Sequence, residues 1–276
     1  MAGSSSRLAV SLATLVAWTV INVFGTKLFY PPETALDELV TTGISWPILF
    51  ACLLLVAIAL WQRWTDLRFR APDPGTLKLL LFPGFLVLLL LALAVMSGLP
   101  SSSVMILLGM NTLLVGFSEE TMFRGILYRA LRGRLGIWPA ILVTTAAFGS
   151  VHILNGFGTG DFGSALIQAI AAGCTGLLLI AVLLRTGSLW AAIVFHALWD
   201  WATFLVVVGA KARPSPDTVE TAAAVVPPGM LAQALLPLVM VLPGTLYGLW
   251  LLRNVHKRSA PGDLKLGSDE GRGGET

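Results

Sequence analysis

Several ionisable side chains lie inside otherwise apolar stretches of this sequence. They are Glu119, Glu120, Arg124, His152, His196 and Asp200. An ionisable group at the centre of a membrane-spanning helix costs about 2.5 to 3.5 kcal/mol on insertion scales, so such residues normally face a cavity or a partner. Their clustering therefore predicts a functional site.

Helical spacing separates the two adjacent glutamates. Glu120 and Arg124 are four residues apart and share a helix face, so we predict a structural ion pair between them. Glu119 points about 100° away and is left as the free carboxylate. His196 and Asp200 share a face of another helix by the same rule of four.

Two histidines, a free carboxylate and a second acidic side chain are able to hydrolyse an amide bond. Glu119 could deprotonate a water and later protonate the leaving amine, with His152 positioning the water. His196 and Asp200 could stabilise the developing oxyanion. A zinc ion held by Glu119, His152 and His196 would serve equally well, because a bound metal lowers the pKa of its water. The residues alone do not choose between these mechanisms.

The composition places these residues in a membrane protein. The chain has 276 residues, of which 56% are hydrophobic and 12% charged, whereas soluble domains carry about 25% charged residues. Its apolar blocks are long enough for helices to cross about 30 Å of hydrocarbon. We predict an all-α polytopic membrane bundle of about eight transmembrane helices, with spans at 8–25, 46–62, 77–96, 104–131, 137–153, 164–184, 188–208 and 230–252.

The four candidate catalytic residues should reach similar depths in the bilayer. Counted at about 1.5 Å per residue from the inner end of each span, Glu119 and His152 lie roughly 20 and 24 Å deep. His196 and Asp200 lie roughly 12 and 18 Å deep by the same count. Three separate spans can therefore bring these side chains together.

The distribution of basic residues predicts the orientation. With the N-terminus inside, the outer loops hold only Lys27, Lys211 and Arg213, and most other basic residues fall on inner segments. This positive-inside pattern predicts that both termini are cytoplasmic. High Ala, Leu, Gly and Arg usage favours a bacterial cell membrane. The formal charge of +3 is too small to indicate nucleic-acid binding, so the expected partners are the lipid bilayer and a peptide or membrane-protein substrate.

Three short motifs carry a family resemblance. They are Glu-Glu-Thr-Met-Phe-Arg at 119–124, Phe-Gly-Ser-Val-His at 148–152 and His-Ala-Leu-Trp-Asp at 196–200. In this order and on three spans, they resemble the motifs of the CAAX protease and bacteriocin-processing family (CPBP, or Abi), to which the type II CAAX prenyl endopeptidases belong. The resemblance covers about Val104 to Val208. It implies an intramembrane endopeptidase with a glutamate or metalloprotease mechanism.

The resemblance also implies roles for individual residues. Glu119 and His152 would activate water, and His196 with Asp200 would stabilise the oxyanion. The structural residues at the site would be Glu120, Arg124 and Phe148. The prenyl endopeptidases typically have asparagine where this chain has Asp200, so a direct amide donor there is in doubt. A protonated Asp200, or a metal, could substitute.

The same reasoning divides the chain and leaves other functions open. We expect N-terminal spans at 1–103, the protease core at 104–208, an outer loop with the last span at 209–256, and a flexible polar tail at 257–276. The substrate, and whether it is lipidated, stay open. A non-proteolytic membrane scaffold or immunity protein is the alternative. A proton-coupled transporter is less favoured, because the sequence has no inverted pair of broken spans.

Overall fold

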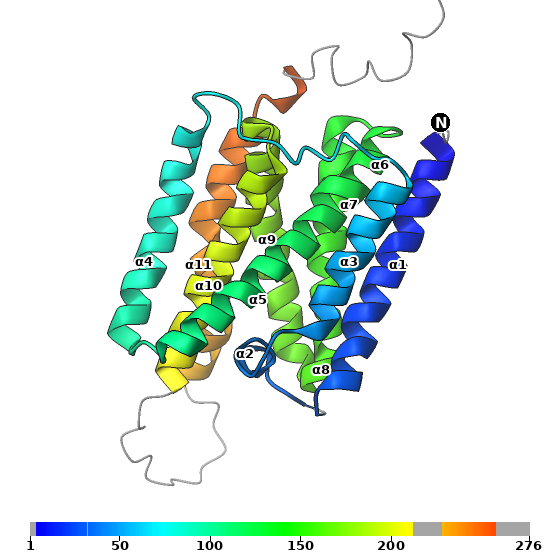
Figure 1. The fold of residues 1–276 in the computed structure, drawn as a ribbon. Coiled ribbons are helices and arrows are strands. Elements are labelled where there is room, and N and C mark those ends of the chain that lie inside the picture. The colour runs from blue at the N-terminus through cyan, green and yellow to red at the C-terminus, as the bar shows by residue number, and fades with distance from the viewer. Residues whose placement is uncertain (1–3, 32, 212–227, 258–276) are drawn as a thin grey trace, which may run out of the picture.

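The computed structural model describes residues 4–31, 33–211 and 228–257, which are mostly helical (Figure 1). Eight apolar helices of this described part correspond to the predicted spans, and the prediction of an all-α membrane bundle is confirmed. They are α1 (Ser4–Phe29), α3 (Trp46–Trp61), α4 (Leu81–Ser97), α5 (Ser102–Glu120), α7 (Ile137–Val151), α9 (Phe162–Thr186), α10 (Leu189–Lys211) and α11 (Pro228–Leu252). Shorter helical pieces connect them.

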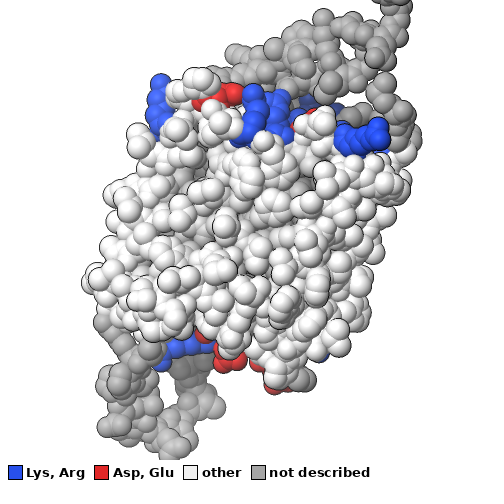
Figure 2. All heavy atoms as spheres, viewed as in Figure 1, with Lys and Arg blue, Asp and Glu red and all other residues white. Residues whose placement is uncertain are grey.

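Helix length and surface polarity both fit a bilayer. Six helical segments of the described residues have at least 18 residues with a strongly apolar window, and such a helix covers about 27 Å. Trp46–Trp61 and Leu236–Leu252 are apolar but shorter. Figure 2 shows charged side chains gathered at two ends of the visible face, with a broad uncharged band between them. The chain is an integral membrane protein.

The start of α1 and the end of α11 lie at the same end of the bundle (Figure 1). The connection from α3 to α4, which carries Arg63, Arg68 and Arg70, crosses this same end. This arrangement agrees with two termini on one side of the membrane, while the cytoplasmic assignment of that side stays a prediction. The predicted flexible tail and most of the outer loop before α11 lie outside the described residues.

The fourth span is interrupted at the candidate site. The segment Ser102–Arg132 contains 31 residues, about 46 Å of helix, so it must tilt to fit a bilayer. Figure 1 shows α5 crossing the bundle obliquely. Directly after Glu120, the chain forms a π-helical turn, η2 (Thr121–Leu127), before α6 (Tyr128–Arg132) completes the span. Such turns are frequent at functional sites, because the wider turn re-aims side chains.

A short helix that the sequence did not predict, α2 (Leu36–Thr41), ties the loop between α1 and α3 to α5. The buried Asn111 amide of α5 donates to the carbonyl oxygens of Val40, at 2.9 Å, and Gly43, at 2.8 Å, and its Oδ1 accepts from the Ser45 N–H at 3.0 Å. Lys211 at the end of α10 also forms an ion pair with Asp37 at 2.7 Å. The loop is therefore fixed to α5 and α10, two of the helices that carry catalytic candidates.

Glycines allow the helices that hold the site to approach closely. A Cβ on Gly116 of α5 would lie 2.9 Å from the Ile193 carbonyl oxygen of α10. On Gly149 of α7, a Cβ would lie 2.7 Å from the Ala169 carbonyl oxygen of α9. Small residues at membrane helix interfaces permit such contacts between backbones. These two crossings place α5 against α10 and α7 against α9.

Replacing Gly149 with alanine should therefore push α7 away from α9. We expect Gly149→Ala to destabilise the protein by about 1 to 3 kcal/mol, the usual range for overpacking, and to reduce activity, because His152 follows on the next turn. The matched control is Gly84→Ala in α4, where a Cβ meets open space. Melting temperatures of the purified variants provide the measurement. Equal melting temperatures for the two variants would contradict the assigned packing role.

Candidate active site

Three helices bring the four predicted catalytic residues together. Glu119 lies in the last turn of α5, and His152 begins the 3₁₀ turn η3 (His152–Asn155) that follows α7. His196 and Asp200 lie one turn apart on α10. The Glu119 Oε2 atom is 4.0 Å from His152 Nε2 and 3.7 Å from His196 Nε2. The structure thus places the free carboxylate between the two histidines.

The Glu119 carboxylate is enclosed but reachable. Its side chain is 16% exposed, and that of His152 is 13% exposed. The Oε2 atom accepts no hydrogen bond from the described residues. Separations of 3.7 and 4.0 Å to the imidazole nitrogens are too long for direct hydrogen bonds and suit a bridging water.

The backbone fixes how His152 faces this carboxylate. Its Nδ1 lies 2.8 Å from the Phe148 carbonyl oxygen, which can only accept a hydrogen bond, so Nδ1 carries a proton. In the neutral imidazole, Nε2 then has a lone pair directed toward Glu119. A water there could donate to His152 Nε2 and to Glu119 Oε2.

His196 faces carboxylate oxygens through both ring nitrogens. Its Nδ1 is 2.8 Å from Glu120 Oε1, and its Nε2 is 3.4 Å from Asp200 Oδ2. The side chain is almost fully buried, at 6% exposure. Because Glu120 is paired with Arg124, it is an ionised carboxylate and accepts a hydrogen bond from the Nδ1–H of His196. This hydrogen bond fixes the ring orientation of His196.

The pair between Glu120 and Arg124 lies deeper than the other site residues. Their side chains are 0% and 1% exposed, and Arg124 Nη1 is 3.1 Å from Glu120 Oε1. Arg124 Nη2 donates to the Gly176 carbonyl oxygen at 3.3 Å, and the guanidinium lies 4.0 Å over the Phe148 ring. The predicted pair is therefore present. It also supports His196 through the shared Glu120 carboxylate, a contact that the sequence did not indicate.

Phe148 supports the other side of the site. Its ring centre is 5.0 Å from that of His152 and 6.0 Å from that of His196, both edge-on. Phe123 packs edge-on against the same ring at 5.2 Å. Phe148 is thus a packing platform shared by both histidines and by Arg124.

A comparison with known families covers the segment that carries these residues. Residues 100–202 match the sequence profile of the family described as type II CAAX prenyl endopeptidase Rce1-like. This segment of the chain is therefore similar to the CAAX proteases. It runs from just before α5 to Ala202 in α10 and contains all three motifs. A search of curated proteins and a search of solved structures found no match.

Two groups of residues at the candidate site were not predicted from the sequence. A Cβ on Gly176 would lie 3.1 Å from the Phe148 ring and 3.2 Å from Arg124 Nη2, so a larger residue would crowd their stacking. Trp18 of α1 donates to Ser118, the neighbour of Glu119, at 2.8 Å. Gly173 and Gly176 form a weak signal for close packing on α9, whereas nothing in the sequence marks Trp18.

The donor atoms at the site meet only part of what a metal ion requires. Both histidines present Nε2 toward Glu119, as zinc ligands would. In residues 4–31, 33–211 and 228–257, however, no group of three or more His, Cys, Asp or Glu side chains is arranged to hold a metal ion. In this arrangement the residues do not fit a metal.

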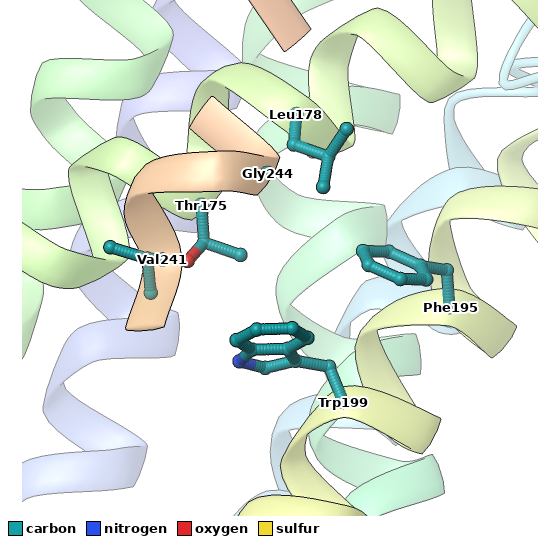
Figure 3. A pocket seen from close by; sticks show the side chains of 6 residues that line it. All are labelled: Thr175, Leu178, Phe195, Trp199, Val241 and Gly244. Carbon is teal, nitrogen blue, oxygen red and sulfur yellow. The ribbon is translucent and has the colours of Figure 1, made fainter. Parts of the chain in front are cut away.

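An apolar hollow lies on another side of α10 (Figure 3). Phe195 and Trp199 of α10 point into it, opposite α9 and α11. Its lining comprises Thr175, Leu178, Phe195, Trp199, Val241 and Gly244. The Thr175 hydroxyl donates to the Ala171 carbonyl oxygen of its own helix. No acidic, basic or histidine side chain lines the hollow, so the candidate catalytic groups remain those around Glu119.

Proposed function

We propose that this chain is an intramembrane endopeptidase that hydrolyses a peptide bond with a water activated by Glu119 and His152. The observation that carries the proposal is the position of the Glu119 carboxylate, between two imidazole Nε2 atoms at 3.7 and 4.0 Å inside an apolar bundle. A charged group there is costly to keep, and catalysis accounts for that cost.

The reaction follows from the donor and acceptor positions. The oxygen of a water held by Glu119 and His152 attacks the carbonyl carbon of the scissile bond, and its proton passes to Glu119. The carbonyl oxygen becomes an oxyanion, which His196 stabilises through Nε2 when that nitrogen carries a proton. The carbon–nitrogen bond then breaks, and Glu119 returns the proton to the leaving amine. The products are a carboxylic acid and an amine.

Asp200 distinguishes this chain from the asparagine-bearing members of the family. Its Oδ2 lies 3.4 Å from His196 Nε2, close enough to contact the same oxyanion. A carboxyl group donates a hydrogen bond only when it is protonated, whereas an amide donates at every pH. An asparagine at this position would therefore donate to the oxyanion without having to carry an extra proton.

We accordingly expect Asp200→Asn to remain active, because the amide keeps a hydrogen-bond donor beside the oxyanion. One oxyanion donor is worth about 10² to 10³ in kcat, so a gain of about tenfold in kcat over the wild type is a conservative expectation. The measurement is kcat of both purified proteins. Inactivity of Asp200→Asn would indicate that the carboxylate itself is required.

The proposed substrate is a peptide or membrane protein that reaches the bundle from the bilayer. Whether it must be prenylated can be tested with two quenched fluorescent peptides that share a C-terminal CAAX sequence. One carries a farnesyl group and the other does not. Cleavage of the farnesylated peptide alone would assign a lipidated substrate.

The test of function is a comparison of membrane proteomes from cells expressing the wild type or Glu119→Gln. We expect at least one peptide terminus to be present with the wild type and absent with the variant. The matched control is Glu38→Gln, the same change in α2, distant in sequence from the three motifs. Identical termini in all three cell lines, at equal expression, would contradict proteolysis and favour a scaffold. Dialysis of the purified enzyme against a chelator, followed by readdition of zinc, tests the metal mechanism separately.

A further inference from the structure

Trp18 of α1 lies directly behind the candidate active site. Its Nε1 donates to the Ser118 hydroxyl at 2.8 Å, and Ser118 precedes Glu119 in the chain. Both side chains are buried, with Trp18 5% and Ser118 1% exposed. Trp18 lies outside the segment that matches the family, so it belongs to a part of the chain for which the motifs assign no role.

Helices α1 and α3 both hydrogen-bond to this end of α5. Trp18 of α1 donates to the Ser118 hydroxyl. The Cys52 thiol of α3 donates to the Leu114 carbonyl oxygen, one turn before Ser118, at 3.4 Å. In a buried site, loss of one partner leaves another polar group unsatisfied, which is costly. This small polar network therefore fixes the rotation of α5 relative to α1 and α3.

That rotation determines where Glu119 points. Neighbouring side chains on a helix diverge by about 100°, so Ser118 faces α1 and α3 while Glu119 faces α7 and α10. The π-helical turn η2 begins at Thr121, two residues after Glu119. The regular hydrogen-bonding pattern of the α-helix therefore changes directly after the catalytic carboxylate. A hydrogen bond on the rear face of the preceding turn restrains the rotation of that turn.

The Trp18 ring also supports the histidine side of the site. It packs edge-on against Phe123, with ring centres 5.6 Å apart at 88°. Phe123 packs against Phe148 at 5.2 Å, and Phe148 contacts both catalytic histidines. Trp18 thus contacts Ser118, next to the Glu119 carboxylate, and also Phe123, which packs on the ring that contacts the two histidines.

We propose that Trp18 is a positioning residue for the hydrolytic reaction, through Ser118 for Glu119 and through Phe123 and Phe148 for the histidines. The inference rests on the proposed function, because it assigns Glu119 as the base. It gives the N-terminal spans a part in catalysis, although the family motifs lie on later helices.

The test measures kcat and KM for Trp18→Phe, Ser118→Ala and the double variant. The purified full chain is assayed in detergent with a quenched fluorescent peptide that spans the cleavage sequence found in the proteome comparison. Trp18→Phe keeps an aromatic ring and removes the N–H donor, while Ser118→Ala removes the acceptor. Misplacement of a reacting group by about 1 Å can reduce the rate 10²-fold, so we expect kcat to fall about tenfold in each single variant with KM unchanged. The double variant should lose no more, because both changes remove the same hydrogen bond.

The matched control is Trp61→Phe, the same change at a tryptophan that is 72% exposed on α3. Its kcat should equal that of the wild type. Equal kcat values for Trp18→Phe, Ser118→Ala and Trp61→Phe would overturn the inference, as would losses that multiply in the double variant. Melting temperatures identify any variant that fails to fold, and in that case the remaining single variant decides. Glu119→Gln is assayed alongside: its activity would defeat the proposed function, whereas its inactivity beside a fully active Trp18→Phe would defeat only the positioning role.

Discussion

Glu119→Gln is expected to abolish cleavage while leaving the fold intact. An amide cannot accept the proton of the attacking water, and general acid–base catalysis by one group contributes about 10²- to 10⁴-fold. Glu119 has no cationic partner on its own helix, since Arg124 is paired with Glu120 at 3.1 Å. Removing the negative charge of Glu119 therefore leaves no positively charged side chain of that helix without its partner. Stability should be retained or raised, as is common when a functional group that is costly to bury is replaced.

The measurement combines kcat/KM on the identified peptide with the melting temperature of the purified variant. Expression from the wild-type promoter, with equal protein in the membrane fraction, controls for folding in cells. Wild-type turnover by Glu119→Gln would remove this residue from the mechanism. A melting temperature several degrees below that of the wild type would show that Glu119 also stabilises the bundle.

The spans were predictable because their signal is local. Each apolar block must hydrogen-bond its own backbone in lipid, so length and hydrophobicity alone specify a helix. The pair of Glu120 with Arg124, and that of His196 with Asp200, follow from the same local geometry, because residues four apart share a face. The π-helical turn after Glu120 did not disturb the first pair.

Contacts between helices could not be predicted in the same way. The hydrogen bond from His196 to Glu120 depends on how α5 and α10 are rotated against each other, and the close crossing at Gly116 sets that rotation. Trp18 and Ser118 are 100 residues apart in the chain, and neither residue type indicates the other. The helix α2 has only six residues, too few for a periodic pattern, and depends on Asn111 for its position.

Breaking the buried pair of Glu120 and Arg124 is expected to have the largest effect on stability. Loss of one partner from a buried ion pair typically costs about 3 to 5 kcal/mol, because the remaining charge is uncompensated in a low-dielectric interior. Arg124→Met leaves Glu120, which is 0% exposed, with the His196 hydrogen bond as its support. Glu120→Gln leaves Arg124 with the Gly176 carbonyl and the Phe148 ring. Arg124→Met should therefore be the more damaging single change.

The double variant, Glu120→Gln with Arg124→Met, should recover part of the stability lost in either single variant, because no uncompensated charge remains. The glutamine carbonyl oxygen can still accept a hydrogen bond from the His196 Nδ1–H, so the orientation of that ring should be retained. Melting temperatures of the wild type, the two single variants and the double variant form a complete cycle, with Glu119→Gln as the matched change at the adjacent residue. If Glu119→Gln is the destabilised protein and Glu120→Gln is stable but inactive, then Glu120 is the catalytic carboxylate and Glu119 is the structural one.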